Sequence, residues 1–153
     1  MFVGFANAQA GNVVVTTTLT DVISLTIVIP AAAIAMTSAD HYQNGTSTDI
    51  PAALTISTNQ AWDLSVKAQN ANSSYLLNDI PVGNFSVTVS GEADGVNSGA
   101  TALTTADQVL INGASGVALT SLAVNYAAAG GSSFIGTAAG AYTNTYVFTV
   151  TAD

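Results

Sequence analysis

Residues 54–68 read LTISTNQAWDLSVKA, and they contain the plainest structural signal in the chain. From residue 62 to residue 68, every second side chain is apolar and those between are polar or charged. The apolar members are Trp62, Leu64, Val66 and Ala68. A period of two is typical of a β-strand that turns one face to a core and the other to solvent. Residues 54–57 alternate in the same way and Asn59-Gln60 marks a turn, so the stretch predicts two consecutive strands.

The same alternation recurs along most of the chain. It is found in residues 13–19, 23–29, 84–90, 121–126 and 145–151, where β-branched and aromatic side chains dominate. Residues 31–39 and 127–140 are rich in alanine or glycine and carry neither helix caps nor a helical period, so helix and irregular loop both remain open for them. Seven short strands separated by turn signals predict an all-β, antiparallel, immunoglobulin-like β-sandwich without internal repeats.

Charge is scarce in this chain. Of its 153 residues, 9 are acidic and 1, Lys67, is basic, which gives a formal net charge of −8. Nucleic acid and anionic lipid surfaces are bound through basic clusters, so both are excluded as partners. The chain has no cysteine and a single histidine, which excludes thiol catalysis and multi-histidine metal sites. We therefore expect no enzyme, no cofactor and no metal.

The polar surface must be built mainly from threonine, serine, asparagine and glutamine, which suits an assembly or an extracellular protein. Residues 1–10 read MFVGFANAQA, an apolar stretch that ends in an Ala-x-Ala pattern typical of signal-peptide cleavage. We interpret them as a signal-peptide remnant, with an apolar N-terminal arm as the alternative. No apolar run is long enough for a spanning helix, so membrane insertion is not expected.

Residues that carry chemistry are few and scattered. His41 lies in a turn-rich stretch, and we interpret it as a surface-loop side chain. Asp63 is expected to be a solvated carboxylate, with a pair to Lys67 on the same strand face as the alternative. Residues 91–99 read GEADGVNSG and are interpreted as an acidic hairpin tip, with a Ca²⁺ site as the alternative. The oxygen ligands of that alternative site are Glu92, Asp94 and Asn97.

Two features of the sequence suggest a relation to carbohydrate, as a modification or as a ligand. The chain contains three N-x-S/T sequons that are candidate glycosylation sites, at Asn44, Asn72 and Asn84. Four aromatic side chains are candidates for a sugar-stacking platform: Trp62, Tyr42, Tyr75 and Tyr126. The strand alternation places Trp62 and Tyr126 on the core side, so packing is favoured over sugar binding for these two.

The N-terminal strand is the most informative feature for function. Residues 13–19 follow a flexible Ala/Gly/Asn stretch and extend over roughly 23 Å at about 3.3 Å per residue. Such a strand either pairs within its own sandwich or fills a groove in the next subunit, which is donor-strand complementation. In the second case four alternate side chains are the contacts with the groove: Val13, Val15, Thr17 and Leu19. Head-to-tail insertion does not close on itself, so it builds a filament of identical subunits. The last strand, residues 146–151, is the alternative donor.

Several stretches resemble small secreted proteins of Bacteroidetes-type bacteria. The similar stretches are GNVVVTTTLTDVISLTI at 11–27, DHYQNGTS at 40–47, LTISTNQAWDLSVKA at 54–68, L-T-x-x-D-Q-x-L-I at 103–111 and Y-T-x-T-Y-x-F-T-V at 142–150. The two terminal strands also resemble those of fimbrial and matrix-fibre subunits, which implies a β-sandwich that assembles by strand donation. The disulfide and penultimate tyrosine of chaperone–usher pilins are absent, so the resemblance is to the bundling pili and matrix fibres that lack them.

Together these observations predict three segments and one function. The segments are a signal-peptide remnant or arm at 1–10, a donor strand at 11–21 and a β-sandwich at 22–153. The predicted function is that of a structural subunit of an extracellular filament at the cell surface, such as a pilus, a fimbria or a biofilm matrix fibre. The alternative is a self-contained secreted sandwich that acts as a carbohydrate-binding module or adhesin, with Tyr42 or Tyr75 against a surface glycan.

Overall fold

The computed structural model describes residues 15–91, 95–97 and 99–152. The expected signal-peptide remnant and Val13 lie outside these residues. The elements of the described chain are β1 (Ile23–Ile27), α1 (Ala39–Asn44), β2 (Thr46–Thr58), β3 (Trp62–Ala68), β4 (Asn72–Tyr75), β5 (Asn78–Pro81), η1 (Val82–Asn84), β6 (Phe85–Ser90), β7 (Val96–Asn97), β8 (Thr101–Ala102), β9 (Gln108–Ala114), β10 (Val117–Ala128) and β11 (Tyr146–Ala152).

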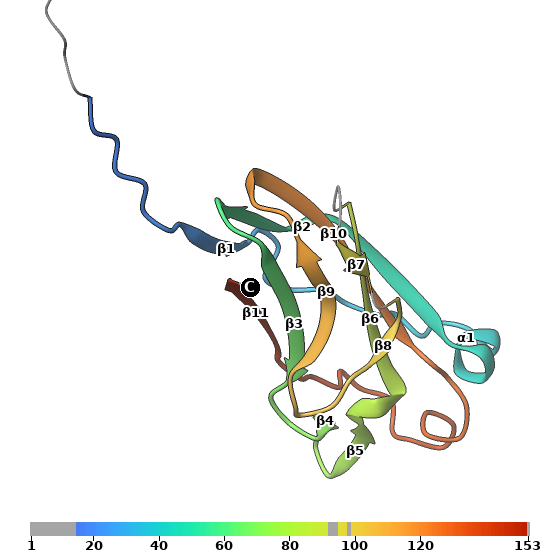
Figure 1. Cartoon of the computed structure of the whole chain (residues 1–153). Helices are drawn as coiled ribbons and strands as arrows, with labels where there is room; N and C mark the ends of the chain where they lie inside the picture. The colour runs from blue at the N-terminus through green and yellow to red at the C-terminus, as the bar shows by residue number, and fades with distance from the viewer. Residues whose placement is uncertain (1–14, 92–94, 98, 153) are drawn as a thin grey trace, which may run out of the picture.

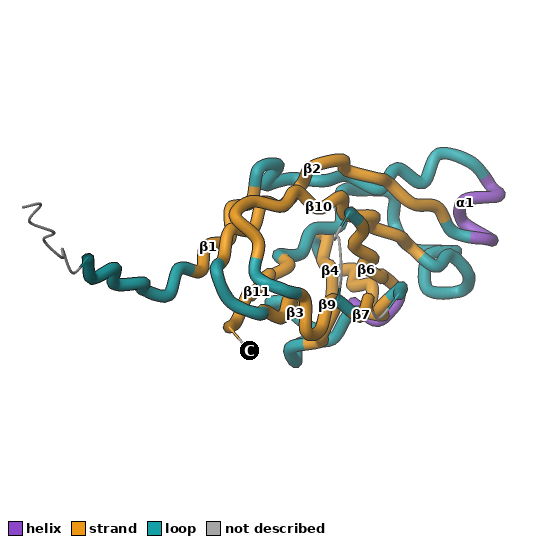
Figure 2. The backbone as a smooth tube through the Cα atoms, turned by 45° about the horizontal axis from the view of Figure 1, so that its top comes forward, coloured by secondary structure: helices purple, strands orange, loops and turns teal. Residues whose placement is uncertain are grey.

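Two sheets pack face to face (Figures 1 and 2). The larger has the strand order β1-β2-β10-β6-β8 and the smaller the order β11-β3-β9-β7, while β4 and β5 form a separate hairpin. Every pair in these sheets is antiparallel. The expected all-β, antiparallel sandwich is therefore confirmed.

Six strands follow the immunoglobulin order with one position vacant, while β9 and β7, from the chain between β6 and β10, are added at the other edge of β3. The neighbours β1-β2-β10-β6 take the places of strands A, B, E and D, and β3 and β11 take those of C and F. In an immunoglobulin sandwich a further strand, G, pairs with the outer edge of F. Within the part of the chain that the structure describes, β11 pairs with β3 and no strand occupies its other edge.

The core is built around β3, as its sequence pattern predicts. The side chains of Trp62, Leu64, Val66 and Ala68 are all buried, and those between them are half-buried. The indole Nε1 of Trp62 donates a hydrogen bond to the backbone oxygen of Ser115 at 2.9 Å, so its polar atom is satisfied. Facing side chains of β2, β6, β9 and β10 complete one continuous apolar cluster between the sheets.

The long strand β2 explains how the chain leaves the sheet after β1. Residues 54–58 pair with both β1 and β10, whereas residues 46–50 pair with β10 alone. Between the halves, Pro51 has no N–H to donate, and Ala52 has a positive φ of 51°. The register with β10 shifts near this point. Residues 28 and 29 still bond to the backbone oxygen of Ala53, after which residues 30–37 run without strand pairing.

The structure decides between, corrects or adds to the expectations at three places. Residues 15–19 form no strand in the described chain, so the alternative in which this segment pairs within its own sandwich is not found for its described part. His41 lies in α1 and not in a loop, because the Ser38 hydroxyl caps the helix by accepting from the His41 N–H at 3.2 Å. The strand β9 and the hairpin β4–β5 were not predicted, since neither has clean alternation: β9 buries the consecutive residues Leu110 and Ile111.

Candidate functional site: an open groove between β1 and β11

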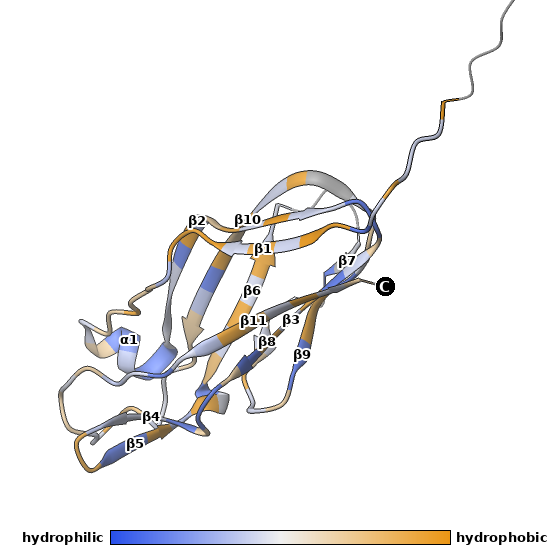
Figure 3. Cartoon of the chain, turned by 90° about the vertical axis from the view of Figure 1, so that its left-hand side faces the viewer, coloured by the Kyte–Doolittle hydropathy of each residue, from blue (hydrophilic) through white to orange (hydrophobic). Residues whose placement is uncertain are grey.

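The sandwich is closed at its centre and open along one side, where β1 and β11 are edge strands of opposite sheets (Figure 3). On β1, Ile23 and Ile27 remain 41% and 46% exposed. On β11, Tyr146, Phe148 and Val150 pack against the core but are only half-buried. The corresponding apolar side chains of the central strand β3 are all buried. Within the described residues, the core is therefore only partly covered on the β1/β11 side, where the two edge strands approach each other without pairing.

A groove of about 560 Å³ starts between these edges, at Ile27, Tyr146 and Phe148, and continues between the chain segments that follow β1 and precede β11. Residues 29–34 and Met36 form one wall, and residues 137–146 with Phe148 form the other. Phe85 of β6 and Tyr126 of β10 also line it. Among the described residues that line the groove, the side chains are aliphatic, aromatic or neutral polar, with no carboxylate, lysine or histidine. Such a lining suits apolar side chains and offers no acid–base pair for catalysis.

Two tyrosine rings join the sheets inside the groove. The rings of Tyr126 and Tyr146 stack with centroids 6.0 Å apart and an interplanar angle of 28°. Burial raises the pKa of Tyr126 above its ordinary value. Burial and, secondly, the charge of Tyr126 raise the pKa of Tyr146 to about 12. Both phenols therefore stay neutral at physiological pH, in keeping with an uncharged groove.

The β4–β5 hairpin bounds one end of the groove. Its Tyr75 ring lies 5.7 Å from the ring of Tyr142, centroid to centroid. Gly140 makes this approach possible, since a Cβ there would lie 2.1 Å from Cε1 of Tyr75. The side-chain amide of Asn144 donates to the backbone oxygens of Asn70 and Asn72 at 2.8 and 3.0 Å. These contacts fix the hairpin to the segment that leads into β11.

The candidate donor segment points away from its own sandwich. Val15 and Leu19 are 81% and 86% exposed, and Thr17 is also exposed. Figure 1 shows residues 15–22 leaving the body beside β1, at the end opposite β4–β5. The turn after β2 holds the base of this segment: Asn59 accepts from the Val22 N–H at 2.9 Å through Oδ1 and donates to the Thr20 oxygen at 2.9 Å through Nδ2.

The alternative donor, the C-terminal strand, belongs to its own sandwich in this structure. All seven residues of β11 are in register with β3, from Tyr146 opposite Ala68 to Ala152 opposite Trp62. The N-terminal segment is therefore the unpaired terminal segment of the two within the described residues.

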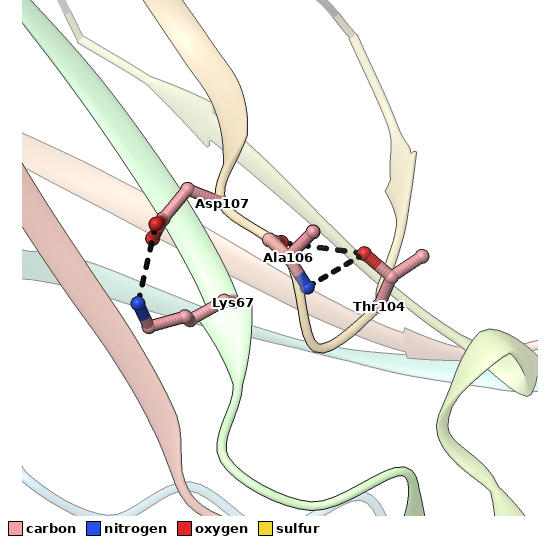
Figure 4. Close-up of polar contacts among 4 residues, drawn as sticks. All are labelled: Lys67, Thr104, Ala106 and Asp107. Atoms are coloured by element: carbon pink, nitrogen blue, oxygen red, sulfur yellow. Dashed lines mark hydrogen bonds and ion pairs between the residues drawn. The ribbon is translucent and has the colours of Figure 1, made fainter.

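The structure separates Asp63 from Lys67. The Nζ atom of Lys67 lies 3.2 Å from Oδ2 of Asp107, in the turn before β9 (Figure 4). The same turn is braced by Thr104, whose hydroxyl bonds to both the N–H and the oxygen of Ala106 at 3.2 Å. Asp63 accepts from the Gly113 N–H at 2.7 Å. The alternative pair with Lys67 is not formed, since Lys67 pairs with Asp107. Asp63 is half-buried and partly open to solvent, and it also accepts this one backbone hydrogen bond from β9.

The three sequon asparagines lie on surface elements, and each uses its amide nitrogen. Asn44 Nδ2 donates to Asp40 Oδ1 at 2.6 Å, and Asn72 Nδ2 lies 3.4 Å from Asp79 Oδ2. Asn84 Nδ2 donates to the Pro81 oxygen at 3.0 Å. A glycan would be attached at these same nitrogens, and each would keep one N–H for its present hydrogen bond. Glycosylation at these sites stays a prediction.

The other predicted binding residues are not brought together. Trp62 is buried in the core and Tyr75 packs on Tyr142, so the four aromatic side chains share no exposed platform. Glu92 and Asp94 of the alternative Ca²⁺ site lie outside the described residues. Within those residues, no group of three or more His, Cys, Asp or Glu side chains is placed to hold a metal ion. His41 accepts a hydrogen bond from the Thr37 N–H at 3.2 Å through Nδ1.

Sequence reasoning missed the groove walls and the residues that fix its end. Residues 30–36 and 137–144 are apolar or small but have no period of two or 3.6, which left their role open. The available signal was an apolar composition without periodicity, directly next to the predicted strands at 23–29 and 145–151. The roles of Tyr142 and Asn144 have no sequence signal that we can identify.

Comparison with known proteins does not assign the chain to a family. No protein-family model matches the chain, and no curated protein sequence matches it. In the described part of the chain, no helix combines the length and the apolar character needed to cross a membrane.

Proposed function

We propose that this chain is a structural subunit of an extracellular filament, of the pilus, fimbria or matrix-fibre kind, and that it polymerises by donor-strand complementation. In this proposal, residues 13–19 of one copy fill the groove between β1 and β11 of the next. The function requires no catalysis, cofactor or metal. The partner is an identical subunit, and the place of action is the cell surface.

Within the described residues the strand position beside β11 is vacant, and this observation carries the proposal. An immunoglobulin sandwich without its G strand has one open sheet edge and an uncovered core face at the same place. Here the edge of β11 and the half-buried side chains of Tyr146, Phe148 and Val150 coincide in this way. A donated strand supplies both missing components, because its backbone pairs with the edge and its alternate side chains cover the core.

The donor segment and the vacant edge match in length. The strand β11 has 7 residues. Residues 13–19 are the same number, and an extended strand of this length spans roughly 23 Å. Their alternation also fits, since Val15, Thr17 and Leu19 lie on one face while Thr16 and Thr18 lie on the other.

A copy is poorly placed to fill its own groove. The bonds from Asn59 to Thr20 and Val22 hold the base of the segment at the end of the sandwich. Gln60 adds a hydrogen bond to the carboxylate of Asp21. From this base the chain would have to reverse direction within very few residues to lie beside β11. Donation to another copy needs no such reversal.

The composition supports an assembly as well. Val15 and Leu19 place two large apolar side chains in solvent in a single copy, and β1 adds Ile23 and Ile27. Burial in a neighbour would remove this apolar surface from water at about 25 cal/mol per Å². In a filament, the neighbouring copy would therefore bury these side chains, which are exposed in a single copy.

The test is electron microscopy of three purified forms of the full chain. The first is unaltered, the second carries Val15→Asp with Leu19→Asp, and the third carries Thr16→Asp with Thr18→Asp. The two variants have the same net charge, and only the second changes the face that enters the groove. We expect filaments from the first and third forms and single copies from the second. Filaments of equal length from the second form would refute the proposed donor.

A further inference from the structure

The β4–β5 hairpin ends in two leucines that their own chain leaves in solvent. Leu76 is 80% exposed and Leu77 is 101% exposed. Tyr75 pairs with Asn78, so Leu76 and Leu77 form a two-residue turn. Leu76 has a φ of +54°, a conformation that such turns normally give to glycine, asparagine or aspartate. Two leucines at this position are unfavourable for the isolated hairpin, both in conformation and in exposure.

The hairpin presents these leucines at a fixed place. The hydroxyl of Ser74 donates to Asp79 Oδ1 at 2.6 Å, across the two strands. The backbone N–H of Ser74 donates to the Thr143 oxygen at 3.3 Å, and the Thr143 N–H donates back at 3.4 Å. With the Tyr75–Tyr142 ring contact, the hairpin is therefore tied to the segment that enters β11.

The direction of strand donation places another copy in front of this tip; this step rests on the proposed function. A strand in the G position runs antiparallel to F, so a donor beside β11 has Leu19 near Tyr146 and its N-terminal end near Ala152. The body of the donating copy follows Leu19. It therefore lies beyond the Tyr146 end of the groove, which is the end that carries β4–β5 (Figure 3).

The surface that the donating copy turns toward the hairpin is partly apolar. Its donor segment leaves the body beside Val22, which is 51% exposed. Leu119, near the start of β10, is 69% exposed at the same end, since Val117 is paired with Thr58 next to the Asn59 turn. Each copy has a net charge of −8, so a close contact between copies is favoured where neither surface is charged.

We propose that Leu76 and Leu77 form a second contact between successive copies of this chain. The tip of the hairpin of the accepting copy packs on the end of the donating copy, around Val22 and Leu119. Strand insertion then links the copies, and the hairpin contact sets their angle and adds buried apolar surface. Leu76 and Leu77, which are unfavourable in the isolated hairpin, then contribute to assembly and not to the stability of one copy.

The test replaces the tip with the turn that a hairpin prefers, Leu76→Gly with Leu77→Ser. In the full chain, we expect the melting temperature of single copies to stay unchanged or to rise, because the positive φ is relieved. We expect the critical concentration for filament assembly to rise about tenfold or more, because two large apolar side chains no longer become buried. The matched control is Val109→Thr, which reduces exposed apolar surface on the outer face of β9, away from both ends, and should leave assembly unchanged.

The outcomes distinguish this inference from the proposed function. If the Gly-Ser variant assembles at the same concentration as the unaltered chain while the Val15→Asp, Leu19→Asp variant does not assemble, the hairpin contact is refuted and strand donation stands. If the unaltered chain and the Val15→Asp, Leu19→Asp variant behave alike, strand donation is refuted and the hairpin contact with it. Loss of assembly in the Val109→Thr control to the same extent would also overturn the assignment to the tip.

Discussion

The ring of Tyr146 on β11 stacks on the ring of Tyr126 on β10, so a strand of the smaller sheet is joined to a strand of the larger one across the interior. The pair lies where the sandwich opens, and both rings line the groove. It therefore marks the boundary between the closed core around β3 and the side where the described residues place no strand beside β11.

The first prediction concerns pH. The folded chain keeps the Tyr146 phenol protonated up to a pKa of about 12, whereas the ordinary value is 10.0. A raised acid pKa means that the unfolded state loses its proton first, so the stabilisation is complete below pH 10.0 and is lost as pH rises toward about 12. Urea unfolding across this interval should show falling stability, and Tyr146→Phe should make the fall shallower. An unchanged slope in Tyr146→Phe would contradict the assigned burial, and Tyr42→Phe is the exposed control.

The second prediction contrasts a closed and an open part of the core. Leu64 is fully buried, so Leu64→Ala should lower the free energy of unfolding by about 2–5 kcal/mol. Ile27 is 46% exposed in a single copy, and Ile27→Ala should cost about 1 kcal/mol there. Chemical denaturation of single copies measures both values. Equal costs would show that the β1 side is covered after all.

The third prediction concerns the base of the donor segment. Asn59→Ala removes the bonds to Val22 and Thr20 and should cost about 1 kcal/mol. The Val22 amide should then exchange its hydrogen faster, since its acceptor is gone. Asn59→Asp keeps an oxygen acceptor for that amide and should largely preserve its protection. Equal exchange rates in the two variants would argue against this anchor.

The fourth prediction concerns the ion pair between Lys67 and Asp107. The pair with Asp107 is 3.2 Å long, and its side chains are 38% and 54% exposed. A double-mutant cycle with Lys67→Met and Asp107→Asn should give a coupling free energy below about 1 kcal/mol, because solvent screens exposed charges. A much larger coupling energy would mean that this pair contributes more to the fold than its exposure allows.

The sequence predicts the fold class well because period-two alternation depends on one buried face, and β3 has such a face. The same rule fails for β9, because Leu110 and Ile111 are buried in succession. It also cannot predict α1, a short helix whose first turn is capped by the Ser38 hydroxyl. The donor residues Val15, Thr17 and Leu19 could be proposed from their pattern alone. The groove could not, because its walls are formed by segments without periodicity that come together only through the tertiary fold.

The most direct test of strand donation uses the chain shortened to begin at residue 20 and a synthetic peptide of residues 11–21. If the groove accepts this segment, the peptide should bind one to one and raise the melting temperature of the shortened chain, and a peptide with Val15→Asp and Leu19→Asp should do neither. Absence of binding by the unaltered peptide, or equal stabilisation by both peptides, would contradict the account.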